Sequence, residues 1–355
     1  MNKKKSILES NVLYTMIAII LGFIIGAIFL AVAGISPIEA YTRLFDGIFG
    51  KTKYMVWTLV YAAPLIFTGL SVAFSFRTGV FNIGAEGQFV IGGIVATLLG
   101  IFVELPPVIH AIVCILGAAL AGFVWSYLVG LLKVKRGIHE VLSFIMFNWL
   151  AFYLSNYVVN LESVKASAGG ESSKDILDSA RILLPEGLIK SLGCTAANWG
   201  IVIAVVVAII IWIILDKTTL GYKLKAVGFN QNAALYAGIN SDKSVLTALG
   251  ISGALAGVGG AVQLLGMAGR LTQFAGQEGY GFEGITVALI AGSSPIGCIF
   301  SAIFYGAMKY GGSKLNLIGA PKEVVNIIMG VIIIFIAVSH VFKAFFLKAA
   351  KKGGK

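Results

Sequence analysis

Three glycines and three polar side chains gather in the ten residues 79–88, between two long apolar runs. The polar residues are the amides Asn82 and Gln88 and the carboxylate Glu86. Amide groups both donate and accept hydrogen bonds, which suits a neutral polar solute better than an ion. In an apolar chain such a stretch predicts a broken helix at membrane depth, because irregular backbone is tolerated there only when protein buries it or it lines a watery cavity. Broken helices with polar groups beside them indicate a transport pathway.

A second glycine-rich stretch contains Phe282 and Glu283 and precedes another apolar run. A charge near mid-bilayer costs at least ~2.5–3.5 kcal/mol on insertion scales, so we expect Glu86 and Glu283 to be functional or paired. Each carboxylate could line the pathway, or cap a helix N-terminus where N–H groups are free, and both roles are compatible. Asn148 lies inside an apolar run and completes the polar set. Phe81 and Phe282 could stack on a base or sugar, or pack against protein and lipid.

Composition places these residues in a membrane protein. Only 12% of the 355 residues are charged and 58% are hydrophobic, whereas soluble domains carry about 25% charged residues. Apolar runs near 20 residues recur along the chain, which predicts an all-α polytopic membrane protein. A β-barrel would instead show alternating apolar and polar positions.

About ten transmembrane helices are predicted. The first follows three lysines and is longer than the apolar region of a signal peptide, so it is interpreted as a retained helix. The ten expected segments are residues 12–34, 54–76, 87–103, 108–132, 141–159, 199–215, 244–267, 284–292, 296–311 and 323–342.

Ten crossings put both termini on one side of the membrane. If that side is the cytoplasm, its segments hold 16 of the 27 Lys and Arg residues and the whole net charge of +11, as the positive-inside rule expects. The charge then requires no nucleic acid as a partner. This topology makes residues 161–197 an extracellular loop and residues 217–243 a cytoplasmic one.

The expected helices 2–5 and 7–10 form two sets that resemble each other. Each set begins with a long helix, which is followed by a glycine-rich break that carries a Glu. This pattern favours inverted repeats, although so short a match could arise by chance.

The cytoplasmic segment 217–243 contains helix-forming residues between two glycines, which predicts a short docking helix; a plain surface loop is the alternative. Part of it resembles the short signature with which ABC-importer permeases contact their ATPase, with Asn232 at the position of a Glu. The residues that would make this contact are Gly228, Asn230, Asn232, Ala233, Ala234 and Gly238.

The chain resembles the permease family of bacterial ABC importers for simple sugars, ribose and nucleosides, and within it the nucleoside (guanosine-type) uptake permeases. The similar runs are residues 81–88, 137–141, 148–149, 226–238 and 252–257. The resemblance implies that residues 1–355 form one transmembrane permease domain in the bacterial cell membrane.

The resemblance also implies partners. These are a cytoplasmic ATP-binding subunit that holds ATP and Mg²⁺, a second permease subunit, and an extracellular, often lipid-anchored, binding protein that delivers a nucleoside or sugar. A heterodimer of permeases is favoured over a homodimer. This chain would then bind no cofactor and catalyse no reaction. The run Gly50-Lys51-Thr52 is no phosphate-binding loop, because Phe45 stands where the leading glycine would be.

Three alternatives stay open. A simple-sugar permease would use the same amides and aromatic rings. An ion-coupled secondary transporter would use Glu86 and Glu283 as coupling carboxylates. An intramembrane enzyme would need a His-Glu-x-x-His or Gly-x-Ser-x-Gly motif, and the sequence has neither. The three histidines are far apart along the chain, so a metal site is not expected.

Overall fold

The computed structural model of the chain describes residues 11–166, 170–319 and 323–352, which form α-helices joined by turns and short extended segments. Strand-like pairing among these residues is limited to isolated bridges. The predicted all-α fold is therefore confirmed. The chain divides into two compact units, one comprising residues up to 55 together with those from 307 onward, and the other comprising residues 56–306.

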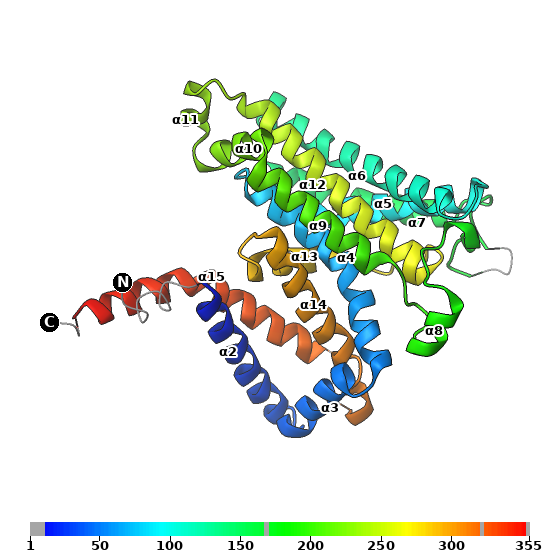
Figure 1. Cartoon of the computed structure of the whole chain (residues 1–355), viewed down its shortest axis with the longest axis horizontal. Helices are drawn as coiled ribbons and strands as arrows, with labels where there is room; N and C mark the ends of the chain where they lie inside the picture. Colours follow the sequence, from blue (N-terminus) through cyan, green and yellow to red (C-terminus); the bar gives the residue numbers. More distant parts are fainter. Residues whose placement is uncertain (1–10, 167–169, 320–322, 353–355) are drawn as a thin grey trace. The chain divides into compact units, whose positions relative to one another are not determined.

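The larger unit contains the predicted pathway residues and the predicted docking segment. It is built from long apolar helices with shorter helices in the connections between them (Figure 1). The long helices are α4 (Thr52–Phe76, which begins in the smaller unit), α5 (Ala85–Phe102), α6 (Ile109–Arg136), α7 (Glu140–Val159), α9 (Gly200–Lys217), α12 (Ser241–Gln263) and α14 (Pro295–Gly312, which ends in the smaller unit). The short helices are α8 (Glu186–Leu192), α10 (Thr219–Phe229), α11 (Gln231–Tyr236) and α13 (Tyr280–Ile290).

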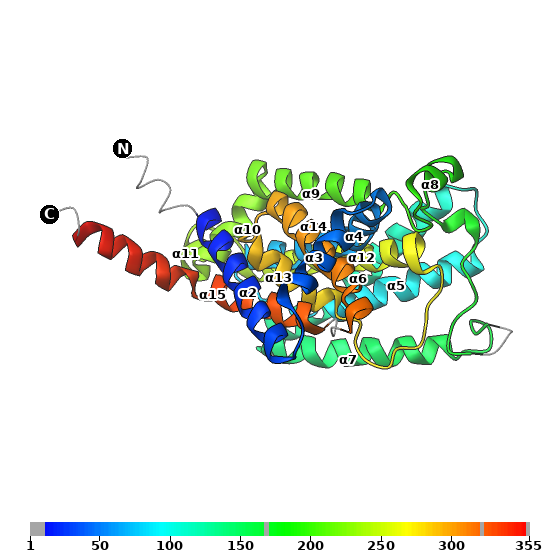
Figure 2. The same cartoon turned by 90° about the horizontal axis from the view of Figure 1, so that it is seen from below.

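Helices α5, α6 and α12 lie side by side (Figure 1), and α7 and α9 lie on opposite sides of them (Figure 2). Glycines allow the three helix backbones to meet. A Cβ atom on Gly92 of α5 would lie 2.2 Å from the carbonyl oxygen of Gly257 in α12, and one on Gly122 of α6 would lie 2.2 Å from that of Gly253. Such small-residue contacts are how helices associate where lipid provides no hydrophobic driving force.

Every predicted span has a helix at its position, but the helices are not equally long. Seven in the described residues are long and apolar enough to cross a membrane. The predicted eighth span corresponds to α13, which has only 11 residues. At about 1.5 Å per residue this helix is about 16 Å long, roughly half of the ~30 Å hydrocarbon core. The ten crossings, the inverted halves and the side on which the termini lie stay predictions.

The smaller unit consists of α2 (Asn11–Val32), α3 (Pro37–Phe49), the end of α14 and α15 (Glu323–Lys352). Helix α2 packs against α15 through Gly22, where a Cβ atom would come within 2.4 Å of Ile332. The Tyr41 hydroxyl of α3 donates a hydrogen bond to the Phe23 carbonyl. Burial raises the pKa of Tyr41 to about 12, because the apolar surroundings disfavour the charged phenolate.

Candidate functional site

The two glycine-rich breaks meet in space. Helix α5 begins at Ala85 after the first break, and α13 begins at Tyr280 after Gly279, whose φ is +91°. A Cβ atom on Gly281 would lie 2.1 Å from the backbone nitrogen of Glu86. The first turns of α5 and α13 are therefore in direct backbone contact, although 195 residues separate them along the chain.

Glu86 joins these two helix ends. Its side chain is fully buried, with the residue only 1% exposed. One carboxylate oxygen accepts the N–H of Gly279 and the other accepts the N–H of Gly281, each at 2.7 Å. Glu86 thus caps the N-terminus of α13 while it stands in the first turn of α5. Both helix dipoles have their positive end here, so one negative charge offsets two N-termini.

The amides of the first break form a buried network with protein partners. Asn82 donates to the Gln88 side-chain oxygen at 2.9 Å and to the Ser252 hydroxyl at 2.6 Å. Its own oxygen accepts the Gly84 N–H at 2.9 Å and the Gln88 amide at 3.0 Å. The Ser252 hydroxyl in turn donates to the Ser71 carbonyl of α4. The network ties α4, the break and α12 together.

Asn148 of α7 supports the same break from the other side. Its side-chain oxygen accepts the Gly87 N–H at 2.9 Å, and its amide donates to the Ile83 carbonyl at 3.0 Å. Backbone groups in a break have lost their helical partners, and side chains must replace those partners inside a membrane. Asn148 supplies two of the missing hydrogen bonds.

The remaining residues of the predicted site are Phe81, Phe282 and Glu283. Phe81 stacks on Phe76 with ring centroids 5.1 Å apart. Phe282 is exposed and Glu283 is half-buried. The structure therefore brings Asn82, Gln88 and Asn148 together around the first break, where Glu86 joins the break to α13. A role for any of the seven in lining a pathway stays a prediction.

Ser71 and Ser252 were not among the sequence-predicted residues. Both are fully buried, and their hydroxyl groups lie 3.0 Å apart. The sequence signal for Ser71 and Ser252 is a hydroxyl residue inside an apolar run. This signal is weak, because many such residues hydrogen-bond only to the backbone of their own helix. Thr97, for example, donates to the Gly93 carbonyl one turn earlier.

The predicted docking segment folds as two short helices, α10 and α11, where one was expected. Asn230 separates them and caps α11, because its side-chain oxygen accepts the Ala233 N–H at 3.0 Å. Gly238 follows α11 with φ +78° and ends it as predicted. Asn232 and Ala233 are exposed, whereas Ala234 is buried.

Gly228 does not stop a helix, contrary to the prediction, because it lies inside α10. It is a contact residue: a Cβ atom on Gly228 would lie 2.3 Å from the Arg77 carbonyl oxygen, and one on Gly79 would lie 3.2 Å from the Gly228 Cα atom. The docking segment therefore rests directly on the start of the first break. Val227 and Val80, both buried, belong to one apolar cluster at this contact.

The outer surface of α10 and α11 carries aromatic and apolar side chains beside exposed polar ones such as Lys223 and Gln231. Phe229 is 90% exposed and Tyr236 is 93% exposed, and Tyr222 and Leu235 are exposed beside them. We call these four residues the aromatic docking surface. Sequence reasoning missed them because an aromatic residue beside an apolar run is usually buried, and only the helix faces show which ones point outward.

Among the described residues, no group of three or more His, Cys, Asp or Glu side chains could hold a metal ion. The site consists of buried amides, one buried carboxylate and the N-terminal ends of two helices. Discontinuous helices that meet inside a membrane bundle are typical of transporters.

Comparison with known proteins assigns the family. The chain matches the family described as "Branched-chain amino acid transport system / permease component" over residues 54–337, and it belongs to this permease family. It is therefore a multi-pass protein of the cell membrane, and the predicted resemblance to ABC-importer permeases is confirmed. No solved structure matches the chain.

Three relatives illustrate the family. The chain is 38% identical to the guanosine ABC transporter permease protein NupP of Bacillus subtilis, over 97% of this chain and 98% of that protein. It is 33% identical to the nucleoside ABC transporter permease protein NupB of Lactococcus lactis, over 96% of this chain and 94% of that protein. It is 31% identical to the guanosine ABC transporter permease protein NupQ of Bacillus subtilis, over 77% of this chain and 85% of that protein.

Proposed function

We propose that this chain is a permease subunit of an ATP-binding-cassette importer and that it carries nucleosides across the cell membrane. The observation that carries this proposal is the near full-length similarity to permeases named for guanosine and nucleosides. The buried amides are compatible with it, because groups that both donate and accept suit a neutral polar solute.

The proposal includes partner subunits. Two guanosine permeases of one bacterium are similar to this chain, which favours a heterodimer of two related permease chains. A cytoplasmic ATPase subunit would bind ATP and Mg²⁺, so this chain would hold no cofactor and catalyse no reaction. An extracellular solute-binding lipoprotein would deliver the nucleoside.

The ATPase would dock on the aromatic docking surface. Exposed aromatic residues are typical of protein contacts, because they bury much apolar area with few rotatable bonds. Movement of α10 would reach the first break through the backbone contact of Gly228 with Gly79. The break holds the N-terminus of α5, so α5 and the short helix α13 are the elements that would move during alternating access.

The test uses the complete importer, with this chain, its permease partner, the ATPase and the binding protein, in liposomes. ATP-dependent uptake of labelled guanosine is expected, and Gly228→Val is expected to abolish it by forcing α10 off the break. Gly187→Val is the matched control, because a side chain at Gly187 of α8 would meet nothing within 4 Å. Uptake by this chain alone, driven by an ion gradient without ATP, would overturn the proposal.

Simple sugars are the second candidate class. The chain is 28% identical to the glucose ABC transporter permease protein TsgB13 of Haloferax volcanii, over 93% of this chain and 88% of that protein. The same liposomes supplied with labelled ribose and glucose distinguish the two classes. Sugar uptake without nucleoside uptake would favour this second candidate.

A further inference from the structure

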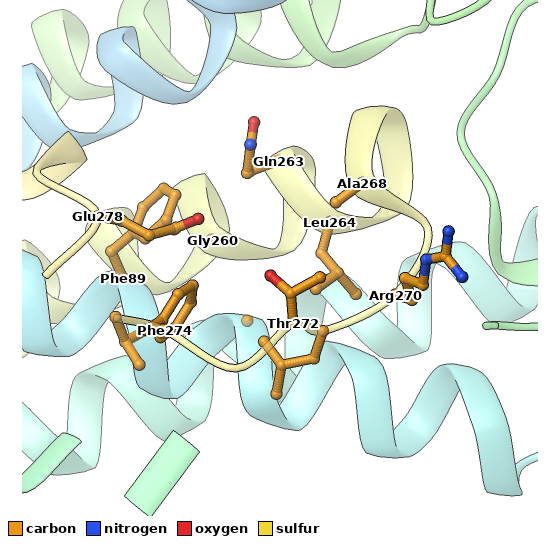
Figure 3. A pocket seen from close by; sticks show the side chains of 12 residues that line it. Phe89, Gly260, Gln263, Leu264, Ala268, Arg270, Thr272, Phe274 and Glu278 are labelled. Atoms are coloured by element: carbon orange, nitrogen blue, oxygen red, sulfur yellow. The ribbon is translucent and has the colours of Figure 1, made fainter. Parts of the chain in front are cut away.

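The N-terminus of α13 is packed firmly against α5. Phe89, one turn beyond Glu86 on α5, stacks on Tyr280, the first residue of α13, with ring centroids 5.2 Å apart. Phe89 also lies at one end of a pocket between α5 and α12, but that pocket encloses only about 40 Å³ (Figure 3). This volume leaves room for a water or two rather than for a nucleoside. The carboxylate and the ring stack therefore hold this end of α13 together.

A single arginine holds the other end of α13. The helix ends at Ile290, and the chain then turns through Gly292 and Ser293, which both have positive φ. The N–H of Ser293 donates to the Ala288 carbonyl at 2.8 Å, which closes the last turn of the helix. The Ser293 carbonyl in turn accepts the ε N–H of Arg77 at 3.0 Å. Arg77 thus binds the turn that ends α13, although 216 residues separate the two along the chain.

The charge of Arg77 suits this position. Arg77 directly follows Phe76, the last residue of α4, so it stands at the C-terminal ends of both α4 and α13. Both ends carry partial negative charge, which a cation offsets. Arg77 therefore mirrors Glu86, whose negative charge stands at the N-termini of α5 and α13. Within the described part of the chain, Arg77 forms no ion pair with an Asp or Glu side chain.

The two anchors of α13 belong to one segment. Arg77 and Glu86 flank the first break, whose residues 77–84 are not helical. The break therefore reaches from the C-terminal end of α13 to its N-terminal end and binds the helix at both. Between these anchors α13 lies directly on α4, because a Cβ atom on Gly284 would be 2.6 Å from the Thr68 Cβ atom. Helix α13 cannot slide along α4 without breaking one of its anchors.

The docking segment touches the same arginine. The backbone of Gly228 in α10 lies against the Arg77 carbonyl, so that a Cβ atom on Gly228 would be 2.3 Å from that oxygen. Arg77 thus contacts α10 through its backbone and the end of α13 through its side chain. A displacement of α10 reaches the end of α13 through this one residue, without passing through residues 78–84.

We propose that Arg77 is the positioning residue that couples α10 to α13, an inference that rests on the proposed importer function. When the ATPase moves α10, Arg77 carries the C-terminal end of α13 with it, while Glu86 joins the N-terminal end to α5. Both ends then move together, and α13 is displaced as a rigid body. Without the Arg77 hydrogen bond, α10 moves the break while the end of α13 stays behind, so that ATP hydrolysis no longer drives transport.

The experiment uses the complete importer in liposomes and measures the guanosine imported per ATP hydrolysed. Arg77→Gln removes the charge and shortens the side chain, so it is expected to lower this ratio about tenfold or more, while ATP hydrolysis continues. Arg77→Lys keeps the charge but not the planar guanidinium, so an intermediate ratio is expected. The matched control is Arg136→Gln, because Arg136 is an exposed arginine at the end of α6, and it should keep the wild-type ratio.

The ratio separates coupling from folding. A residue needed only for folding would lower the amount of assembled complex on gel filtration, but each assembled complex would keep the wild-type ratio. The inference is overturned if assembled Arg77→Gln imports as much guanosine per ATP as wild type. If Arg77→Gln does not assemble, Arg77→Lys decides, and a wild-type ratio for that variant overturns the inference. Absence of ATP-dependent guanosine uptake by wild type would instead overturn the proposed function itself.

Discussion

Glu86 is the residue whose replacement tests the described geometry most directly. Glu86→Ala removes both oxygens that accept the N–H groups of Gly279 and Gly281. Neither N–H has a helical partner, because both stand at the start of α13. The variant therefore leaves two donors unsatisfied at a site that is almost completely buried.

The magnitude follows from these two hydrogen bonds. A hydrogen bond to a charged group contributes about 1.5–3 kcal/mol, so two contribute about 3–6 kcal/mol. Removing the carboxylate also removes the cost of burying its charge, which offsets part of the loss. We expect Glu86→Ala to lower the free energy of unfolding by about 2–5 kcal/mol. Glu86→Gln keeps one acceptor oxygen but places an NH₂ group opposite the second N–H. It should therefore lower the free energy of unfolding by at least half as much as Glu86→Ala.

The assay is unfolding of the purified chain in mixed micelles by titration with SDS, followed by circular dichroism. Glu104→Ala is the control, because Glu104 lies just beyond the opposite end of α5 and is exposed. If Glu86→Ala and Glu104→Ala have the same free energy of unfolding, the Glu86 carboxylate does not hold α13, and the description of the two joined helix ends is wrong.

Three further predictions concern the helix contacts and the smaller unit. Asn148→Ala should cost about 1–3 kcal/mol in the same unfolding assay, because it removes both hydrogen bonds that α7 gives to the break. Gly92→Val should prevent α5 from packing on α12 and should yield little folded protein on gel filtration, whereas Gly93→Val at the neighbouring position should yield normal amounts. Tyr41 should ionise near pH 12. Subtracting the absorbance titration of Tyr41→Phe from that of wild type should therefore show a step near that pH. The contribution of Tyr41 to the free energy of unfolding is present below pH 10 and is lost as the pH rises toward 12. A step near pH 10 would show that Tyr41 is exposed to solvent.

The sequence predicts the helices well because the signal for them is local. An apolar run of the right length must satisfy its backbone within itself when lipid surrounds it, so the run and the helix coincide. The breaks before α5 and α13 follow from local glycines in the same way. The sequence does not show where α13 ends, because the apolar run extends past Ile290. In the structure the chain turns at Gly292 and Ser293, both of which have positive φ.

The pairing of residues far apart in the chain could not be predicted from one sequence. A carboxylate after a glycine break indicates a helix cap, and Glu86 is a cap. The helix that it caps begins at Tyr280, however, and nothing near Glu86 in the chain identifies that helix. The same limit applies to Gly228. A glycine beside a short helical segment indicates a helix end, and only the structure shows that the backbone of Gly79 packs against it.

These long-range contacts form one continuous connection from the docking surface to the start of α13. Gly228 touches the start of the break, the break holds the N-terminus of α5, and α5 carries both Glu86 and Phe89. Gly281 has no side chain that could yield between α5 and α13. A displacement of either helix must therefore carry the other with it or break the two Glu86 hydrogen bonds. Residues 77–84 are the part of this connection that is not helical. We therefore expect φ and ψ changes in those residues to absorb the movement, while α5 and α13 shift as one body.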